Sequence, residues 1–199
     1  MVEFIKKYSM HIFIVIIAVL TVYDIIIWDG LSPVRKLINL FAILAILHEI
    51  EEKYRPGGFV ELMLKKLGVK TDDFDESRAK LNVVIFWLVY IALGYVFDSA
   101  IFLFMMTVFL AIFEALIHTA GIKIHNLDKP YTPGLVTAWL MAILAIYSII
   151  QLNGYGLIVP IDYPIGFVLF VLSFIALASQ TYKLAGLNMK EVIRRIKSQ

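Results

Sequence analysis

The chain has 199 residues, of which 61% are hydrophobic and only 17% are charged, and its mean hydropathy is +0.85. Soluble globular domains carry roughly a quarter charged residues, so this composition excludes a soluble domain and a disordered chain. The high hydropathy also excludes a nucleic-acid binder with a basic face, whereas the formal net charge of +2 says little about partners, and the lack of cysteine excludes disulfides and thiolate chemistry. The composition therefore predicts an integral membrane protein without a nucleic-acid partner.

Apolar stretches long enough to cross a bilayer follow one another along the whole chain. A bilayer core about 30 Å thick needs roughly 20 helical residues. By this length we expect spans at about residues 9–28, 34–52, 80–97, 99–119, 134–152 and 164–182. Turn-forming and polar segments separate these spans. The expected fold class is all-α, a polytopic membrane helix bundle of about six spans that forms a single domain over residues 1–199.

Lysine and arginine residues are distributed very unevenly over the two sides that six spans define. Short loops rich in these residues stay in the cytoplasm. One side holds only Arg35 and Lys36. The side of both termini holds sixteen of the eighteen basic residues, which are Lys6, Lys7, Lys53, Arg55, Lys65, Lys66, Lys70, Arg78, Lys80, Lys123, Lys129, Lys183, Lys190, Arg194, Arg195 and Lys197. We therefore expect both termini in the cytoplasm.

Two further segments combine apolar and charged residues at helical spacing. One is residues 58–67, which follow the turn-forming pair Pro56-Gly57. The other lies in the basic C-terminal tail, residues 183–199. Amphipathic helices of this kind lie in the membrane interface, so we expect both segments on the inner membrane surface.

The second span ends in ionisable residues that a hydrocarbon core does not tolerate. Its uninterrupted apolar run, residues 37–47, is too short to cross, so the helix must continue into polar residues. His48, Glu51 and Glu52 stand at i, i+3 and i+4 and therefore share one helical face, whereas Glu49 points elsewhere. Intramembrane charges call for a partner or a function, which makes this face a candidate site.

The fourth span carries a second pair of the same kind. Glu114 and His118 stand at i, i+4 near the end of this span, and His125 and Asn126 follow in the next loop. Because the second and fourth spans run in the same direction, both polar turns reach the same cytoplasmic face. Asp24, near the outer end of the first span, is expected to snorkel to the interface or to cap a neighbour.

The stretch His48-Glu49-Ile50-Glu51-Glu52 resembles the family of membrane proteins named for their HXXEE motif. Glu114 with His118, and the segment from His125-Asn126 to residue 133, are similar to the remaining polar signature of this family. The resemblance covers residues 48 to about 134. It implies a multi-span membrane protein with a polar site, but no substrate, because the family has no securely assigned activity.

Imidazole and carboxylate groups at this spacing are typical of metal sites in helix bundles. The expected ligands of zinc or iron, in a mononuclear or dinuclear centre, are His48, Glu51, Glu52, Glu114, His118 and His125. Glu52 and Asn126 are the candidate catalytic residues. A metal at the level of lipid headgroups would polarise an oxygen or activate water, so we expect an enzyme that acts on an amphiphilic substrate by hydrolysis or by metal-dependent oxidation.

Three alternatives use the same residues. In the first, histidines and glutamates form only a structural polar cluster that joins two helices. In the second, Glu51-Glu52 with Phe113, His118 and His125-Asn126 is loosely similar to the motifs of CaaX prenyl proteases, which implies a metal-independent glutamate protease. In the third, intramembrane Glu and His residues relay protons in a transporter.

The remaining expectations concern the surroundings of the chain. The strong cytoplasmic charge bias and the first span, interpreted as a retained helix rather than a signal peptide, favour a prokaryotic cytoplasmic membrane. The expected partners are membrane lipids, an amphiphilic small molecule and, on so apolar a surface, a second copy in a homo-oligomer.

Overall fold

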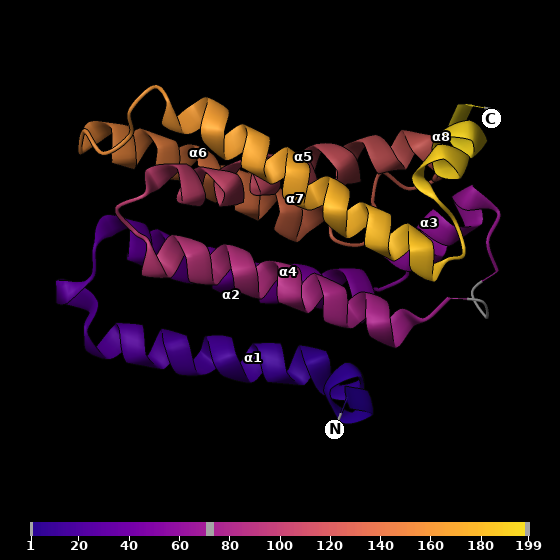
Figure 1. Cartoon of the computed structure of the whole chain (residues 1–199), viewed down its shortest axis with the longest axis horizontal. Helices are drawn as coiled ribbons and strands as arrows, with labels where there is room; N and C mark the ends of the chain where they lie inside the picture. The colour runs from indigo at the N-terminus through magenta and orange to yellow at the C-terminus, as the bar shows by residue number, and fades with distance from the viewer. Residues whose placement is uncertain (1, 71–73, 198–199) are drawn as a thin grey trace.

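The computed structural model of the protein describes residues 2–70 and 74–197, and all regular elements in these ranges are helices (Figure 1). The expected all-α bundle is therefore confirmed. In chain order the elements are α1 (Val2–Ile26), the short 3-10 helix η1 (Trp28–Gly30), α2 (Pro33–Lys53), α3 (Phe59–Leu67), α4 (Glu76–Val96), α5 (Ile101–Ile124), α6 (Leu135–Gly154), α7 (Asp162–Leu184) and α8 (Met189–Lys197).

Five helices, α1, α4, α5, α6 and α7, are long and apolar enough to cross a membrane, which indicates an integral membrane protein. The expected span at residues 34–52 forms α2, a helix of 21 residues that does not belong to these five. Because both ends of α2 carry charged residues, its longest continuous stretch without Asp, Glu, Lys or Arg is residues 37–48. Instead, α2 packs against α1, α4 and α6 within the bundle.

Local sequence explains where α2 and α4 begin. Ser32 precedes Pro33, and its side chain accepts a hydrogen bond from the backbone N–H of Arg35 at 3.2 Å, which caps α2. Asp75 does the same for α4 through the N–H of Arg78 at 3.0 Å. Several helices extend a few residues beyond the expected spans, because a helix can continue past the hydrocarbon core into the interface.

Helix α5 forms the centre of the bundle and α7 lies at its periphery. In the most apolar stretch of each helix, 56% of α5 is buried but only 11% of α7. Helix α5 packs against α4, α6, α7 and α2, and aromatic contacts such as Phe41 with Phe104, at 5.9 Å between ring centroids, join it to α2. The apolar surface that α7 exposes suits a lipid environment.

The two amphipathic segments form helices α3 and α8, at the end of the bundle where α2 stops and α4 begins (Figure 1). They pack on each other through Leu67, Leu187 and Val192. Residues 198–199 of the expected tail lie outside the described residues. The position of α3 and α8 on the inner membrane surface stays a prediction.

Candidate metal centre

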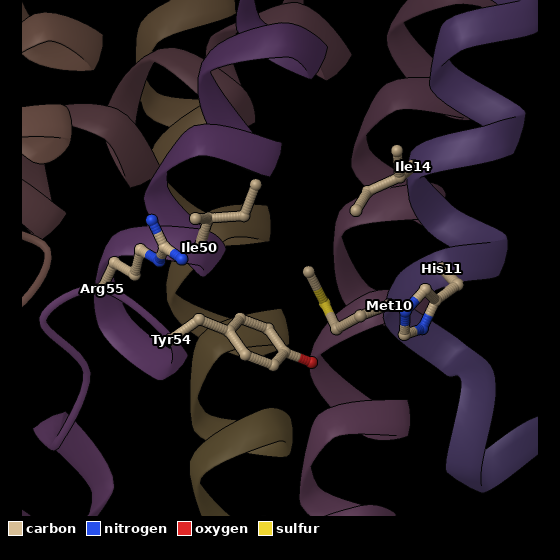
Figure 2. A pocket seen from close by; sticks show the side chains of 6 residues that line it. All are labelled: Met10, His11, Ile14, Ile50, Tyr54 and Arg55. Carbon is tan, nitrogen blue, oxygen red and sulfur yellow. The ribbon is translucent and has the colours of Figure 1, made fainter.

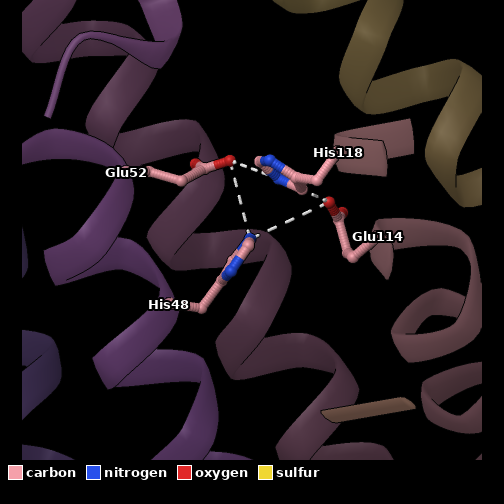
Figure 3. A group of neighbouring side chains, drawn as sticks. All are labelled: His48, Glu52, Glu114 and His118. Atoms are coloured by element: carbon pink, nitrogen blue, oxygen red, sulfur yellow. Dashed lines mark ion pairs between the residues drawn. The ribbon is translucent and has the colours of Figure 1, made fainter. Parts of the chain in front are cut away.

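Two helices bring four ionisable side chains to one buried point. His48 and Glu52 come from α2, and Glu114 and His118 come from α5 (Figure 3). One potential ligand atom from each residue lies within 4.8 Å of those of all the others. Because each pair is spaced i, i+4, each helix presents its histidine and glutamate on one face, and the two faces meet. We call these four residues the inner cluster.

The Nε2 atoms of both histidines point toward the carboxylates (Figure 3). The Nε2 atom of His118 lies 3.0 Å from a Glu52 oxygen and 3.6 Å from a Glu114 oxygen. The corresponding distances from Nε2 of His48 are 3.5 Å and 3.8 Å. The histidine side chains are buried, whereas those of Glu52 and Glu114 are 12% and 17% exposed. The geometry therefore resembles an N₂O₂ ligand set that is slightly open on its carboxylate side.

A threonine on α6 orients the ring of His48. The hydroxyl of Thr137 lies 2.5 Å from a Glu51 oxygen, to which it donates its single hydrogen, and 3.0 Å from Nδ1 of His48. Since the hydroxyl hydrogen is already used, Nδ1 must be the donor in the contact with His48. In the neutral ring this tautomer leaves Nε2 with a lone pair directed at the inner cluster.

A second threonine orients His118 in the same way. The Thr132 hydroxyl donates to the backbone carbonyl of His118 at 2.9 Å and therefore accepts from Nδ1 of His118 at 3.3 Å. The Nε2 atom of His118 is buried and has no hydrogen-bond partner among the described residues, although a Glu52 oxygen is 3.0 Å away. Two electron-rich atoms at this distance repel each other unless a cation lies close to both.

Glu51 lies on α2 beside the inner cluster, but the structure does not bring it into the group. Its carboxylate accepts hydrogen bonds from the backbone N–H groups of Val136 and Thr137 at 3.2 Å and 2.8 Å, in the first turn of α6. Tyr131 donates a further bond at 2.8 Å. Burial and the nearby Glu51 carboxylate raise the pKa of Tyr131, which keeps this donor protonated. Glu51 was expected as a metal ligand, but its carboxylate instead binds the N–H groups at the N-terminus of α6.

Gly134 allows the start of α6 to lie against the inner cluster. Its φ is +94°, in the left-handed region. A Cβ atom built at this position would lie 2.6 Å from a carbon of His118, 2.8 Å from Glu52 and 3.0 Å from His48. Only glycine combines this backbone conformation with so close an approach. On another side the Phe59 ring covers His118, with 4.5 Å between ring centroids.

Glu49 points away from the inner cluster, as its place on the helix predicts. It accepts a hydrogen bond from the indole N–H of Trp87 at 2.9 Å and pairs with Lys53 one turn along α2. A buried carboxylate with both partners in place serves to join α2 to α4.

His125 and Asn126 also lie outside the group of four. His125 follows α5 directly, and burial together with the Lys66 ammonium group lowers its pKa. Asn126 is exposed and has a φ of +50°, a conformation that ends the helix. Their expected roles as ligand and catalytic residue therefore stay predictions without support from this geometry.

The inner cluster opens into the larger of two cavities. A cavity of about 420 Å³ is lined by His48, Glu52 and Glu114, together with apolar residues of α3, α4, α5 and α7. A smaller cavity of about 230 Å³ lies between α1 and α2, where Met10 and Ile14 face Ile50 and Tyr54 (Figure 2). None of the four cluster residues lines the smaller cavity, whereas the larger one gives access to the cluster.

The site includes three residues that the sequence did not predict, Thr132, Gly134 and Thr137. The only signal in the sequence is that two threonines flank a glycine where a span begins. Threonine is common at helix starts, so this pattern alone does not point to histidine partners.

The fold and the site define a class of protein, a helical integral membrane bundle with a buried His/Glu cluster that could bind a metal. A family model described as "Protein of unknown function with HXXEE motif" matches residues 39–149, more than half of the chain, so the chain belongs to the HXXEE family. No curated protein and no solved structure matches it. In this chain the motif residues are His48, Glu51 and Glu52, of which two enter the inner cluster and one fastens α6.

Proposed function

We propose that the protein is a metal-dependent membrane enzyme in which His48, Glu52, Glu114 and His118 hold a divalent ion, zinc or iron. The observation that carries the proposal is the convergence of four ligand atoms, one from each of these side chains, within 4.8 Å of one another. Two histidines and two carboxylates suit either metal. The partners of both Nδ1 atoms support it further, because metal-binding histidines usually donate their other ring N–H to an oxygen.

The competing explanation is a purely structural cluster in which protons replace the metal. A protonated His118 would then form an ion pair with Glu52, whose oxygen lies 3.0 Å from Nε2. A metal ion between the four side chains of the inner cluster would instead attract one ligand atom from each of them. A metal ion accounts for the convergence of both histidines and both glutamates, whereas a proton on His118 accounts for one histidine with its carboxylate partners.

A bound divalent ion would supply Lewis acidity, which polarises a substrate oxygen or lowers the pKa of a water molecule. The chain supplies the surroundings for that chemistry. His48 and His118 are held by Thr137 and Thr132, and Phe59 limits the access of water to His118. Glu52 is partly exposed toward the cavity and is the candidate general base. Both hydrolysis and oxidation are compatible with these groups.

The cavity favours an amphiphilic substrate, with its polar end at the inner cluster and its apolar part between helices. Basic residues gather at the end of the bundle that holds the inner cluster. We therefore propose that this end faces the cytoplasm, in a prokaryotic cytoplasmic membrane. Membrane lipids are then the immediate partners, and a homo-oligomer stays a prediction.

The test is the metal content of protein purified without a metal-affinity tag. Wild-type protein should retain zinc or iron in near-stoichiometric amount, whereas Glu114→Gln and His118→Ala should retain less than about a tenth of it. Glu49→Gln is the matched control, because Glu49 is a buried glutamate of α2 outside the cluster. Equal metal content in wild type and in both cluster variants would contradict the proposal.

The two remaining alternatives give other results in the same preparation. Proteolysis of a prenylated peptide that persists in chelator would favour the glutamate protease. Dissipation of a pH gradient in proteoliposomes, abolished by His118→Ala, would favour transport. Either result, obtained without bound metal, would replace the proposed function.

A further inference from the structure

The larger cavity continues from the inner cluster into the space between two membrane-spanning helices. Helices α4 and α7 meet where the Tyr90 and Ser173 hydroxyls lie 2.5 Å apart. Toward the inner end from this contact, both helices line the cavity instead of closing on each other, α4 through Val83 and Phe86 and α7 through Phe174 and Leu177. Because α7 is largely exposed, this space lies next to the lipid.

The walls of the cavity divide by chemistry. Apolar and aromatic side chains of α4, α5 and α7 form its long sides, among them Phe86, Phe113 and Phe174. The inner cluster forms part of one wall, and Lys53, Lys66 and Lys80 also line the cavity. A chain of methylene groups would fit the first surface, and an anionic oxygen group would fit the second.

The proposed divalent ion favours an acidic head, because carboxylates are common metal ligands. Four glutamates line the cavity, and two of them, Glu52 and Glu114, belong to the inner cluster. Lys53 pairs with Glu49 and Lys80 pairs with Glu76, so a divalent ion at the inner cluster, rather than these lysines, would bind the acidic head. A volume of about 420 Å³ lies in the range of sites that hold one small molecule, about 300–1,000 Å³. One acyl chain fits this size better than a two-chain phospholipid.

We infer that the cavity binds a single-chain lipid with a carboxylate head, such as a long-chain fatty acid, which enters sideways from the bilayer between α4 and α7. The chain lies against Phe86, Phe113 and Phe174, and the carboxylate lies beside Glu52 and Glu114. The placement of the head rests on the proposed metal site, whereas binding of the chain does not.

The lack of cysteine provides a direct test, because any introduced cysteine is unique. Ala178 of α7 lines the cavity, whereas Ala176, two residues earlier on the same helix, is exposed and does not line it. Ala178→Cys and Ala176→Cys would each be labelled with bimane in nanodiscs and quenched with a spin-labelled fatty acid. Quenching at position 178 should saturate and be reversed by palmitate. Quenching at position 176 should rise in proportion to added lipid and resist competition.

Two comparisons identify the ligand class. Palmitate should compete at least tenfold better than hexadecanol, and dipalmitoylphosphatidylcholine should not compete. Chelation of the metal should reduce the preference for palmitate over hexadecanol while competition by both persists. Equal competition by the two-chain lipid, or equal behaviour at positions 176 and 178, would overturn the inference.

A second pair of variants keeps the inference testable without a label. Ala178→Trp would fill the cavity and should lower the retention of radiolabelled palmitate at least tenfold, whereas Ala176→Trp should retain it like wild type. Retained palmitate in Ala178→Trp would overturn the inference. If palmitate binds saturably to a protein that never binds metal, the proposed function fails and the site for the acyl chain stands. If metal binds but palmitate does not, only this inference fails.

Discussion

The bundle buries two polar clusters, one at each end, and they differ in how completely their atoms are paired. At the outer end Asp24 is fully buried and accepts hydrogen bonds from Asn39 and Tyr95, both at 2.5 Å. Asn39 in turn accepts a bond from Thr21 at 3.3 Å. At the inner end, by contrast, the buried Nε2 atom of His118 lies 3.0 Å from a Glu52 oxygen but has no hydrogen-bond partner among the described residues.

The difference separates a structural cluster from a candidate site. A fully paired buried cluster joins α1, α2 and α4 and has no atom left for a ligand. Two buried histidines that converge with two carboxylates leave ligand atoms directed at one point, where a cation can bind. Exposure alone does not distinguish them, because Asp24 is as deeply buried as His118.

The largest expected effect comes from closing the space beside the inner cluster. Gly134→Ala adds a methyl group within 3.0 Å of three cluster residues at a φ of +94°. It should lower the free energy of unfolding in detergent by about 2–5 kcal/mol, from backbone strain and overpacking together, and abolish metal retention. Gly156→Ala is the control, since Gly156 also has a positive φ, +66°, but nothing lies within 4 Å. Equal losses in both variants would show that the clash is irrelevant.

Breaking the outer cluster should cost stability without affecting metal. Asp24→Ala leaves the buried donor of Asn39 unpaired, at about 1–3 kcal/mol, and removes the acceptor of the half-buried Tyr95 hydroxyl. Unfolding in detergent measures this loss, and elemental analysis of the folded fraction should give wild-type metal content. A loss of metal in folded Asp24→Ala protein would mean that the two clusters are not independent.

Removing the partner of one cluster histidine should weaken metal binding while leaving the four ligands in place. Thr137→Val deletes the hydroxyl that accepts from Nδ1 of His48. The loss of such a partner typically costs about 10–100-fold in metal affinity. Competition with a chromophoric chelator measures the change. An unchanged affinity would contradict the assigned role of Thr137.

The smallest effect is expected at a buried hydroxyl that has no role. The Thr107 hydroxyl lies in α5 without a partner among the residues that the structure describes. Thr107→Val keeps the shape and removes an unpaired polar group, so stability should stay the same or rise by up to about 1 kcal/mol, with no change in metal affinity. This variant is the control for Thr137→Val, and a weakened metal affinity here would show that any threonine change perturbs the site.

Periodicity was sufficient to predict most of the fold and the four cluster residues. Spacing of i, i+4 placed His48 with Glu52 and Glu114 with His118, and the parallel direction of the two helices brought the pairs to one level. Hydropathy does not determine the number of spans, because α2 carries charge at both ends. Helix-packing contacts, rather than hydropathy, place α2 within the bundle.

Residues that depend on a third helix could not be predicted. The i, i+3 spacing of Glu51 is compatible with the cluster face, but the N–H groups at the start of α6 capture its carboxylate instead. Asp24 was expected to snorkel or cap, yet two neighbouring helices supply partners that keep it buried. In both cases the outcome depends on which donors lie across a helix interface, and one sequence does not contain that information.

X-ray absorption at the zinc edge, on protein loaded with one equivalent of zinc, tests the central claim most directly. We expect two imidazole nitrogens and carboxylate oxygens at about 2.0–2.2 Å, with one imidazole lost in His118→Ala. A first shell of oxygen alone, or a spectrum unchanged in His118→Ala, would contradict the assignment of the inner cluster as a metal centre.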